Sequence, residues 1–225
     1  MKFFRKYWIV VFGIAFGFYA GLPFLAPVFM HIGWKDAGNA IYFIYSFLCH
    51  QLPERSFFLF GPKLTYTLQE IHATGQNTTN IILLRKFLGN SAMGWKVAWS
   101  DRMVSMFTSL WAFGLLWWPF RKRLPKIPLW GFILFLLPLA VDGGTHFLSD
   151  FSGIGLGFRD ANLWLATLSN NVFRPEFYAG DAWGSFNSMM RLLTGVLFGL
   201  GVAWFAFPYL DDALSEADTP IQPLS

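Results

Sequence analysis

Charged residues and cysteines are both scarce in this sequence. Only 13% of its 225 residues are charged, whereas 55% are hydrophobic and 20% are aromatic. A soluble domain of ordinary composition carries about 25% charged residues, so this composition excludes that class and indicates a membrane protein. The single cysteine excludes a disulfide within the chain. The sequence contains no internal repeat and no glycine-rich phosphate loop, which argues against a solenoid and a P-loop enzyme.

Four apolar stretches are long enough to cross a membrane. The hydrocarbon core is about 30 Å thick, so about 20 apolar residues in a helix span it. The first stretch follows the basic start of the chain and is too long for a cleaved signal peptide, so we expect it to be retained. The sequence therefore predicts an all-α, polytopic integral membrane helical bundle. Its transmembrane helices are expected at Tyr7–Met30, Met103–Pro119, Ile127–Phe147 and Asn187–Tyr209.

Basic residues cluster before the first predicted helix and between the second and third. Cytoplasmic connections carry an excess of lysine and arginine. We therefore expect a multi-pass protein of the cell (cytoplasmic) membrane with both termini in the cytoplasm. Because these residues lie at helix ends and form no extended patch, nucleic acid is not expected as a partner. The basic residues are Lys2, Arg5, Lys6, Arg121, Lys122, Arg123 and Lys126.

The pattern predicts a single transmembrane domain in residues 1–210 and an acidic, disordered cytoplasmic tail in residues 211–225. Two long connections, residues 61–99 and 148–186, then lie on the outer side. Residues 80–99 are interrupted by basic residues and are typical of an amphipathic surface segment, while the aromatic residues of 148–186 suit the headgroup level. These connections form either a lid or docking surface over the bundle, or interfacial helices that seal it.

A polar stretch interrupts the apolar sequence at residues 46–61, SFLCHQLPERSFFLFG. Because Pro53 breaks a regular helix, we expect a re-entrant or interfacial segment here, with its polar groups covered by protein or water. Residues 37–60 either enter and leave on the outer side, which we favour, or pair with a crossing hidden in residues 80–99. The polar residues are Cys49, His50, Gln51, Glu54 and Arg55.

Three further pairs of polar residues lie in or beside the predicted helices. In two of these pairs the residues are four positions apart, so they share one helix face. All three pairs fall near the outer third of the membrane, where an unpaired charge costs from about 2.5 to more than 10 kcal/mol. With residues 46–61 they provide three acids and three arginines, so we expect an ion-pair network around a pocket that opens outward. The pairs are Asp101 with Arg102, Asp142 with His146, and Asn187 with Arg191.

Four motifs occur in an order that resembles a known family. CHQLPERSFFLFG, SDR, PLAVDGGTH and NSMMRLLTG are similar to motifs of a prokaryotic membrane-protein family, domain of unknown function 2085. The resemblance covers about residues 40–205, and Cys-His-Gln-x-Pro-x-Arg-Ser is its most specific part. It implies a polytopic membrane protein with a shared polar site, but no particular activity. Family members commonly carry Cys at the position of Ser100 and often Gln at that of His146, and their counterpart of residues 61–100 is shorter.

Three chemical roles are considered for these side chains, and the sequence identifies no cofactor. Cys49, His50 and His146 with a carboxylate are candidate metal ligands, but the regular Cys-x2-Cys or His-x3-His spacing of zinc sites is absent. Cys49 is a candidate nucleophile, although a lone cysteine in an apolar segment is more often a packing residue. Asp142 with His146 is a candidate acid–base pair for a lipid-linked substrate.

A fourth role is anion binding by Arg55, Arg102 and Arg191, because guanidinium groups bind phosphate and carboxylate through parallel hydrogen bonds. The alternative is that each arginine neutralises one acid, such as Glu54 or Asp142. We expect an integral membrane protein with a polar, ion-paired pocket near the outer face that binds an anionic or lipid-linked small molecule, whether or not it also processes or transports it. The other function considered is a structural or accessory subunit of a larger membrane complex. Membrane lipid and other membrane proteins are the corresponding expected partners.

Overall fold

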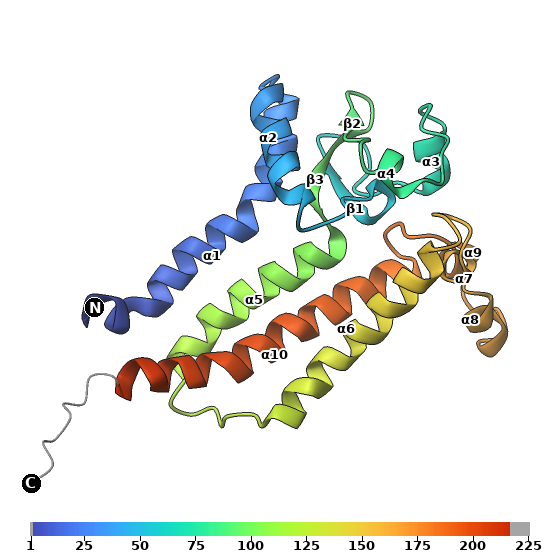
Figure 1. Ribbon diagram of the computed structural model, residues 1–225. Helices are drawn as coiled ribbons and strands as arrows, with labels where there is room; N and C mark the ends of the chain where they lie inside the picture. Colours follow the sequence, from blue (N-terminus) through green and yellow to red (C-terminus); the bar gives the residue numbers. More distant parts are fainter. Residues whose placement is uncertain (1, 217–225) are drawn as a thin grey trace, which may run out of the picture.

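Four long helices dominate the computed structural model, which describes residues 2–216 (Figure 1). They are α1 (Lys2–His31), α5 (Asp101–Phe120), α6 (Leu129–Asp150) and α10 (Phe186–Glu216). Each contains a stretch long and apolar enough to cross a membrane. The four predicted spans are confirmed, and each boundary differs from the prediction by only a few residues apart from the end of α10.

The helices α5 and α10 pack closely because small residues face each other along their contact. A Cβ atom added to Gly195 would overlap the hydroxyl of Ser105, and one added to Gly199 would overlap that of Ser109. The Ser109 hydroxyl donates a hydrogen bond across the interface to the carbonyl of Gly195, at 3.3 Å. In lipid, no hydrophobic force drives helices together. Small residues and hydroxyl groups of this kind instead allow two helices to associate through close packing and hydrogen bonds.

Helix α10 extends further than the sequence indicates. Residues 211–216 belong to this helix and not to a disordered tail, so the predicted tail boundary is wrong. The indole Nε1 of Trp8 donates a hydrogen bond to Asp211 at 3.0 Å, and Arg121 lies 3.7 Å from the same carboxylate. These contacts fix the last turns of α10 against the start of α1 and the end of α5. Residues 217–225 lie outside the described residues.

A three-stranded antiparallel sheet occupies one end of the bundle, which we call the sheet end (Figure 1). Its strands are β1 (Ser56–Leu59), β2 (Gly89–Asn90) and β3 (Gly94–Ser100), in the order β1-β3-β2. The predicted amphipathic segment at residues 80–99 is therefore wrong beyond the short helix α4 (Ile81–Leu84). Lys96 and Trp99, which would face water or headgroups on such a segment, are fully buried in β3. β3 leads directly into α5, so the sheet fixes where that helix begins.

Residues 37–60 contain no helix long enough to cross a membrane. Their helix, α2 (Lys35–Ser46), has 12 residues, which is too short to span a core of about 30 Å. A non-helical segment and the short 3-10 helix η1 (Pro53–Arg55) then lead into β1. Residues 80–99 likewise contain no helix of spanning length.

The remaining short helices also lie at the sheet end, while the start of α1 and the end of α10 lie at the opposite end (Figure 1). They are α3 (Leu68–His72), α7 (Phe158–Ala161), α8 (Leu163–Leu168) and α9 (Pro175–Tyr178). The two long connections thus form one layer over the same end of the bundle. The short helices predicted in these connections are present.

Candidate functional site

The segment between α2 and η1 is held in an irregular conformation by buried polar contacts. Gln51 has a positive φ of 53°, and its side-chain amide donates to the carbonyl of Tyr42 at 2.9 Å. The ammonium of Lys96 donates to the carbonyls of Gln51 and Arg85 at 2.5 and 2.8 Å. Burial lowers the pKa of Lys96 to about 7. These bonds satisfy backbone groups that a regular helix would pair internally.

Glu54 is buried in η1 without a hydrogen bond to its carboxylate. Both carboxylate oxygens lack a partner, and the closest cation is Arg55, whose Nε lies 3.9 Å away. Burial raises the pKa of Glu54 to about 7, against the opposing effect of Arg55. Glu54 is therefore within ion-pair distance of one predicted arginine, but that arginine makes its closer contacts with other acids.

Two arginines from different elements share the carboxylate of Asp181, which lies in the connection between α9 and α10. Arg55 Nε donates to one Asp181 oxygen at 2.8 Å, and Arg191 Nη1 donates to the other at 2.5 Å. Arg55 also makes two parallel bonds of 2.7 Å to Asp150, and Arg191 binds Asp101 through Nε and Nη2. Although burial acts to raise the pKa of Asp181, the two guanidinium groups hold it well below its usual range.

A second cluster surrounds Asp142 on α6. Arg102 Nη2 and Arg159 Nη2 donate to its two oxygens at 2.7 and 2.9 Å. Arg159 also donates to the amide oxygen of Asn187, so Asn187 helps to orient this arginine. The Nδ1 atom of His146 lies 3.5 Å from Asp142 Oδ1, as the four-residue spacing predicts. The two clusters together contain four aspartates and four arginines and carry no net charge.

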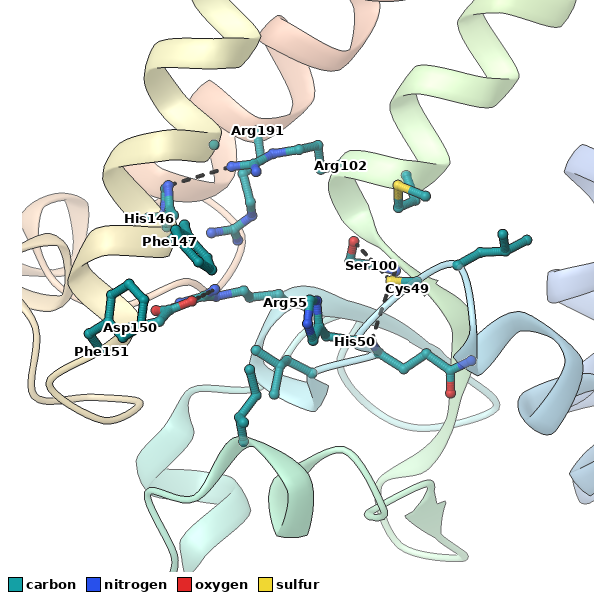
Figure 2. A pocket seen from close by; sticks show the side chains of 16 residues that line it. Cys49, His50, Arg55, Ser100, Arg102, His146, Phe147, Asp150, Phe151 and Arg191 are labelled. Carbon is teal, nitrogen blue, oxygen red and sulfur yellow. Dashed lines mark hydrogen bonds and ion pairs between the residues drawn. The ribbon is translucent and has the colours of Figure 1, made fainter.

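A cavity of about 420 Å³ lies beside these clusters at the sheet end of the bundle (Figure 2). This volume is within the range of about 300–1,000 Å³ that is common for small-molecule sites. Figure 2 shows Cys49 and Ser100 on one side of the cavity and His146, Phe147 and Phe151 on the other. Seven of the predicted site residues line it, namely Cys49, His50, Gln51, Arg55, Arg102, His146 and Arg191. The other four, Glu54, Asp101, Asp142 and Asn187, are buried outside its lining.

The three predicted arginines differ in how many of their donors are already paired. Each guanidinium nitrogen of Arg55 and of Arg191 donates to an aspartate. Arg102 has one short bond to an acid, through Nη2, and its buried Nε has no partner. The Nε2 atom of His146 is also buried without a hydrogen bond, 3.7 Å from Asp181. An unpaired buried N–H group is costly, so the free Nε of Arg102 beside the cavity indicates a place for an acceptor.

Comparison with known proteins identifies the family of this chain. Residues 91–205 match the family model described as predicted membrane protein, DUF2085. The chain is also 31% identical over 212 residues to the uncharacterised protein MJ1492 of Methanocaldococcus jannaschii, covering 91% of this chain and 92% of that protein. The chain belongs to the DUF2085 family. It is thus a predicted membrane protein of the same family that its sequence motifs resemble. No solved structure matches the chain.

The DUF2085 match contains α5, α6 and the first two thirds of α10, and therefore most of the ion-pair network. It begins at residue 91, so the match leaves out the segment from Cys49 to Ser56. In this DUF2085 member the two parts meet in the structure, because Arg55 binds both Asp150 and Asp181. The motif that prompted the resemblance is thus joined to the matched region through ion pairs.

Cys49 is held by backbone groups and by Ser100, at the start of α5. Its sulfur accepts hydrogen bonds from the backbone N–H groups of Gln51 and Ser100 at 3.3 and 3.5 Å, and its thiol donates to the Ser100 hydroxyl at 3.6 Å. Within residues 2–216, the structure shows no hydrogen bond between Cys49 and a histidine. The described residues also contain no cluster of three or more His, Cys, Asp or Glu side chains that could hold a metal ion.

Sequence reasoning missed several members of the network. Asp150 follows Asp142 and His146 at the same four-residue interval, so helical periodicity would have identified it. Arg159, Asn162 and Asp181 lie in or beside the short elements of residues 148–186, where no regular period relates them to the site. They reach it through bonds such as that from Asn162 Nδ2 to Asn187 Oδ1 at 3.1 Å. Only the tertiary structure identifies these three residues as members of the network.

Proposed function

We propose that this protein binds an anionic group, phosphate or carboxylate, in the cavity at the sheet end of the bundle. The observation that supports this is a buried donor without a partner, Arg102 Nε, on the lining of the cavity. An oxyanion accepts hydrogen bonds from a guanidinium and interacts strongly with its charge. The side chain of Arg102 is 20% exposed, so it is the arginine that an anion meets first.

This proposal assigns different roles to the three arginines. Arg102 contacts the anion, whereas Arg55 and Arg191 hold the surrounding acids and fix the cavity wall. Asp142 holds Arg102 in place through its bond of 2.7 Å. The neutral network keeps the empty cavity stable, because every aspartate in it is already paired with an arginine.

Thermal unfolding of the detergent-solubilised protein tests the proposal in slightly acidic buffer, in which inorganic phosphate is mainly the monoanion, with phosphate compared with chloride at equal ionic strength. A ligand that binds the folded state raises the melting temperature with concentration. We expect phosphate to stabilise the native protein more than chloride does, and we expect Arg102→Gln to lose that difference. Arg121→Gln is the matched control, since Arg121 lies at the opposite end of α5. Equal stabilisation of both variants by phosphate would refute an anion site at Arg102.

We also propose that the sheet end faces the cell exterior, because the basic residues cluster at the opposite end of the bundle. A Cys49→Ser background removes the single native cysteine. A membrane-impermeant maleimide added to intact cells should then label Asn77→Cys, in an exposed loop at the sheet end, but not Lys122→Cys. Labelling of Lys122→Cys alone would reverse the orientation.

The second candidate function is that of a subunit in a membrane complex, and one surface favours it. Helix α8 contains no buried residue, and the side chains around it are largely exposed. Leu163 is 71% exposed and Leu168 is 79% exposed, and large apolar patches of this kind mark contacts with lipid or protein. Chemical crosslinking in native membranes distinguishes the two, because a subunit would crosslink to one defined partner through α8.

A further inference from the structure

We infer that the ligand of the cavity is a membrane phospholipid with a singly charged phosphodiester headgroup, bound with its acyl chains against an apolar rim. This inference rests on the proposed anion site and names the class of molecule that occupies it. Three observations carry it, namely the unpaired Nε of Arg102 inside the cavity, the apolar residues at its edge and the zero net charge of the surrounding network.

The edge of the cavity is apolar on two opposite sides. Phe147 and Phe151, near the end of α6, are 63% and 74% exposed, and their rings are in contact with centroids 4.9 Å apart. Leu48, which follows α2, is 50% exposed on the side of the cavity that Cys49 also lines. Figure 2 shows the two phenylalanines beside His146 and Asp150. Donors inside and large apolar side chains outside together match a molecule with an anionic head and an apolar tail.

The position of this edge favours a lipid over a soluble anion. Phe147 lies in the last turns of α6, a helix long and apolar enough to cross the membrane. Exposed apolar side chains on such a helix contact acyl chains, and burial of this apolar surface is favourable. A free anion makes no favourable contact with this rim, whereas a lipid reaches the donors of the cavity without leaving the bilayer.

The charge of the network selects the charge of the ligand. Four aspartates and four arginines compensate each other around the cavity. Any negative charge added to this neutral network is an excess charge, which is costly at membrane depth, so a ligand with one charge is favoured over a ligand with two. Arg102, whose Nε has no partner, is the group that this charge contacts. A phosphodiester carries one negative charge, whereas a phosphate monoester carries more than one at neutral pH.

Native mass spectrometry of the full chain in detergent tests this inference. The probes are phosphatidylglycerol, phosphatidylcholine with the same acyl chains, and glycerophosphoglycerol, which is the phosphatidylglycerol headgroup without acyl chains. We expect phosphatidylglycerol to bind at least about tenfold more tightly than either of the others. Arg102→Gln should abolish that preference. The double variant Phe147→Ser and Phe151→Ser should bind phosphatidylglycerol more weakly, whereas Leu134→Ser, an exposed position elsewhere on α6, should not.

The outcomes separate this inference from the proposed function. If glycerophosphoglycerol binds as tightly as phosphatidylglycerol, or if the rim variant binds the lipid normally, the lipid assignment is wrong and the anion site stands. If phosphatidylcholine competes equally, the selection by charge is wrong. If Arg102→Gln binds phosphatidylglycerol like the native protein, both proposals are wrong. The rim variant must retain its stabilisation by inorganic phosphate, which shows that its cavity is still folded.

Discussion

Asp101 and Arg191 lie 90 positions apart in the chain, yet Arg191 Nε donates to Asp101 Oδ1 at 2.8 Å across the contact between α5 and α10. Both side chains are 2% exposed. The same guanidinium binds the carboxylate and the backbone carbonyl of Asp181, so it joins α5 and α10 to the layer of short elements at the sheet end. Its donors are directed at protein acceptors, which makes Arg191 a structural residue of the cavity wall.

Arg191→Ala should strongly destabilise the protein. The substitution leaves Asp101 without its arginine, and removing one partner from a buried ion pair costs about 3–5 kcal/mol. Thermal unfolding in detergent should show a large fall in melting temperature, whereas Arg121→Ala, a partly exposed control, should show a small one. An unchanged melting temperature combined with lost stabilisation by phosphate would instead make Arg191 an anion contact.

Ser100→Cys should form a disulfide with Cys49 under mild oxidation. The Cys49 sulfur and the Ser100 hydroxyl oxygen are 3.6 Å apart, so a small side-chain rotation brings two sulfurs to bonding distance. A loop of this length stabilises a protein by roughly 4 kcal/mol when it is closed. The disulfide should change mobility on a non-reducing gel. Ser105→Cys, one turn further along α5 and facing α10, should form no bond, and the absence of any bond in Ser100→Cys would contradict the described position of Cys49.

Glu54→Gln should change how stability depends on pH. Burial raises the folded-state pKa of Glu54 from 4.5 to about 7, so its contribution to stability is complete below pH 4.5 and is lost as the pH rises through 7. The neutral glutamine avoids this loss. At about pH 8 the variant should therefore be more stable than the native protein, by roughly 3 kcal/mol.

Melting temperatures measured from about pH 5 to pH 8 check this prediction for Glu54. The advantage of Glu54→Gln should shrink as the pH falls toward 4.5. Lys96, whose pKa is also close to 7, is present in both proteins and contributes to both profiles. Glu70→Gln serves as the control because Glu70 is exposed and pairs with Lys63 at the surface. Parallel profiles of the native protein and Glu54→Gln would mean that Glu54 does not titrate in this range.

Gly199→Ala should weaken the packing of α5 on α10. The added methyl group overlaps the Ser109 hydroxyl and approaches the backbone nitrogen of Leu110, so the helices must separate. Overpacking of this kind costs about 1–3 kcal/mol. Gly21→Ala is the matched control, because a Cβ atom there meets nothing within 4 Å. Equal melting temperatures for the two variants would show that the close approach at Gly199 is not needed.

The sequence by itself determined the membrane character, the four long helices and much of the candidate site. Continuous apolar stretches directly indicate membrane-spanning helices, since a helix needs about 20 such residues to cross the bilayer. Periodicity also placed Asp142 with His146, because residues four apart share a helix face whatever the helix packs against. These features depend only on neighbours in the chain.

Only the tertiary structure decided the rest. Residues 94–100 form a buried strand because β1 lies opposite them, and Lys96 is tolerated there because two backbone carbonyls accept from it. Asp181 joins Arg55 and Arg191 although no sequence interval relates the three. The unpaired Nε of Arg102 likewise results from the way in which four aspartates are shared among four arginines. Such pairings depend on where distant segments meet in space, which local propensity and periodicity do not encode.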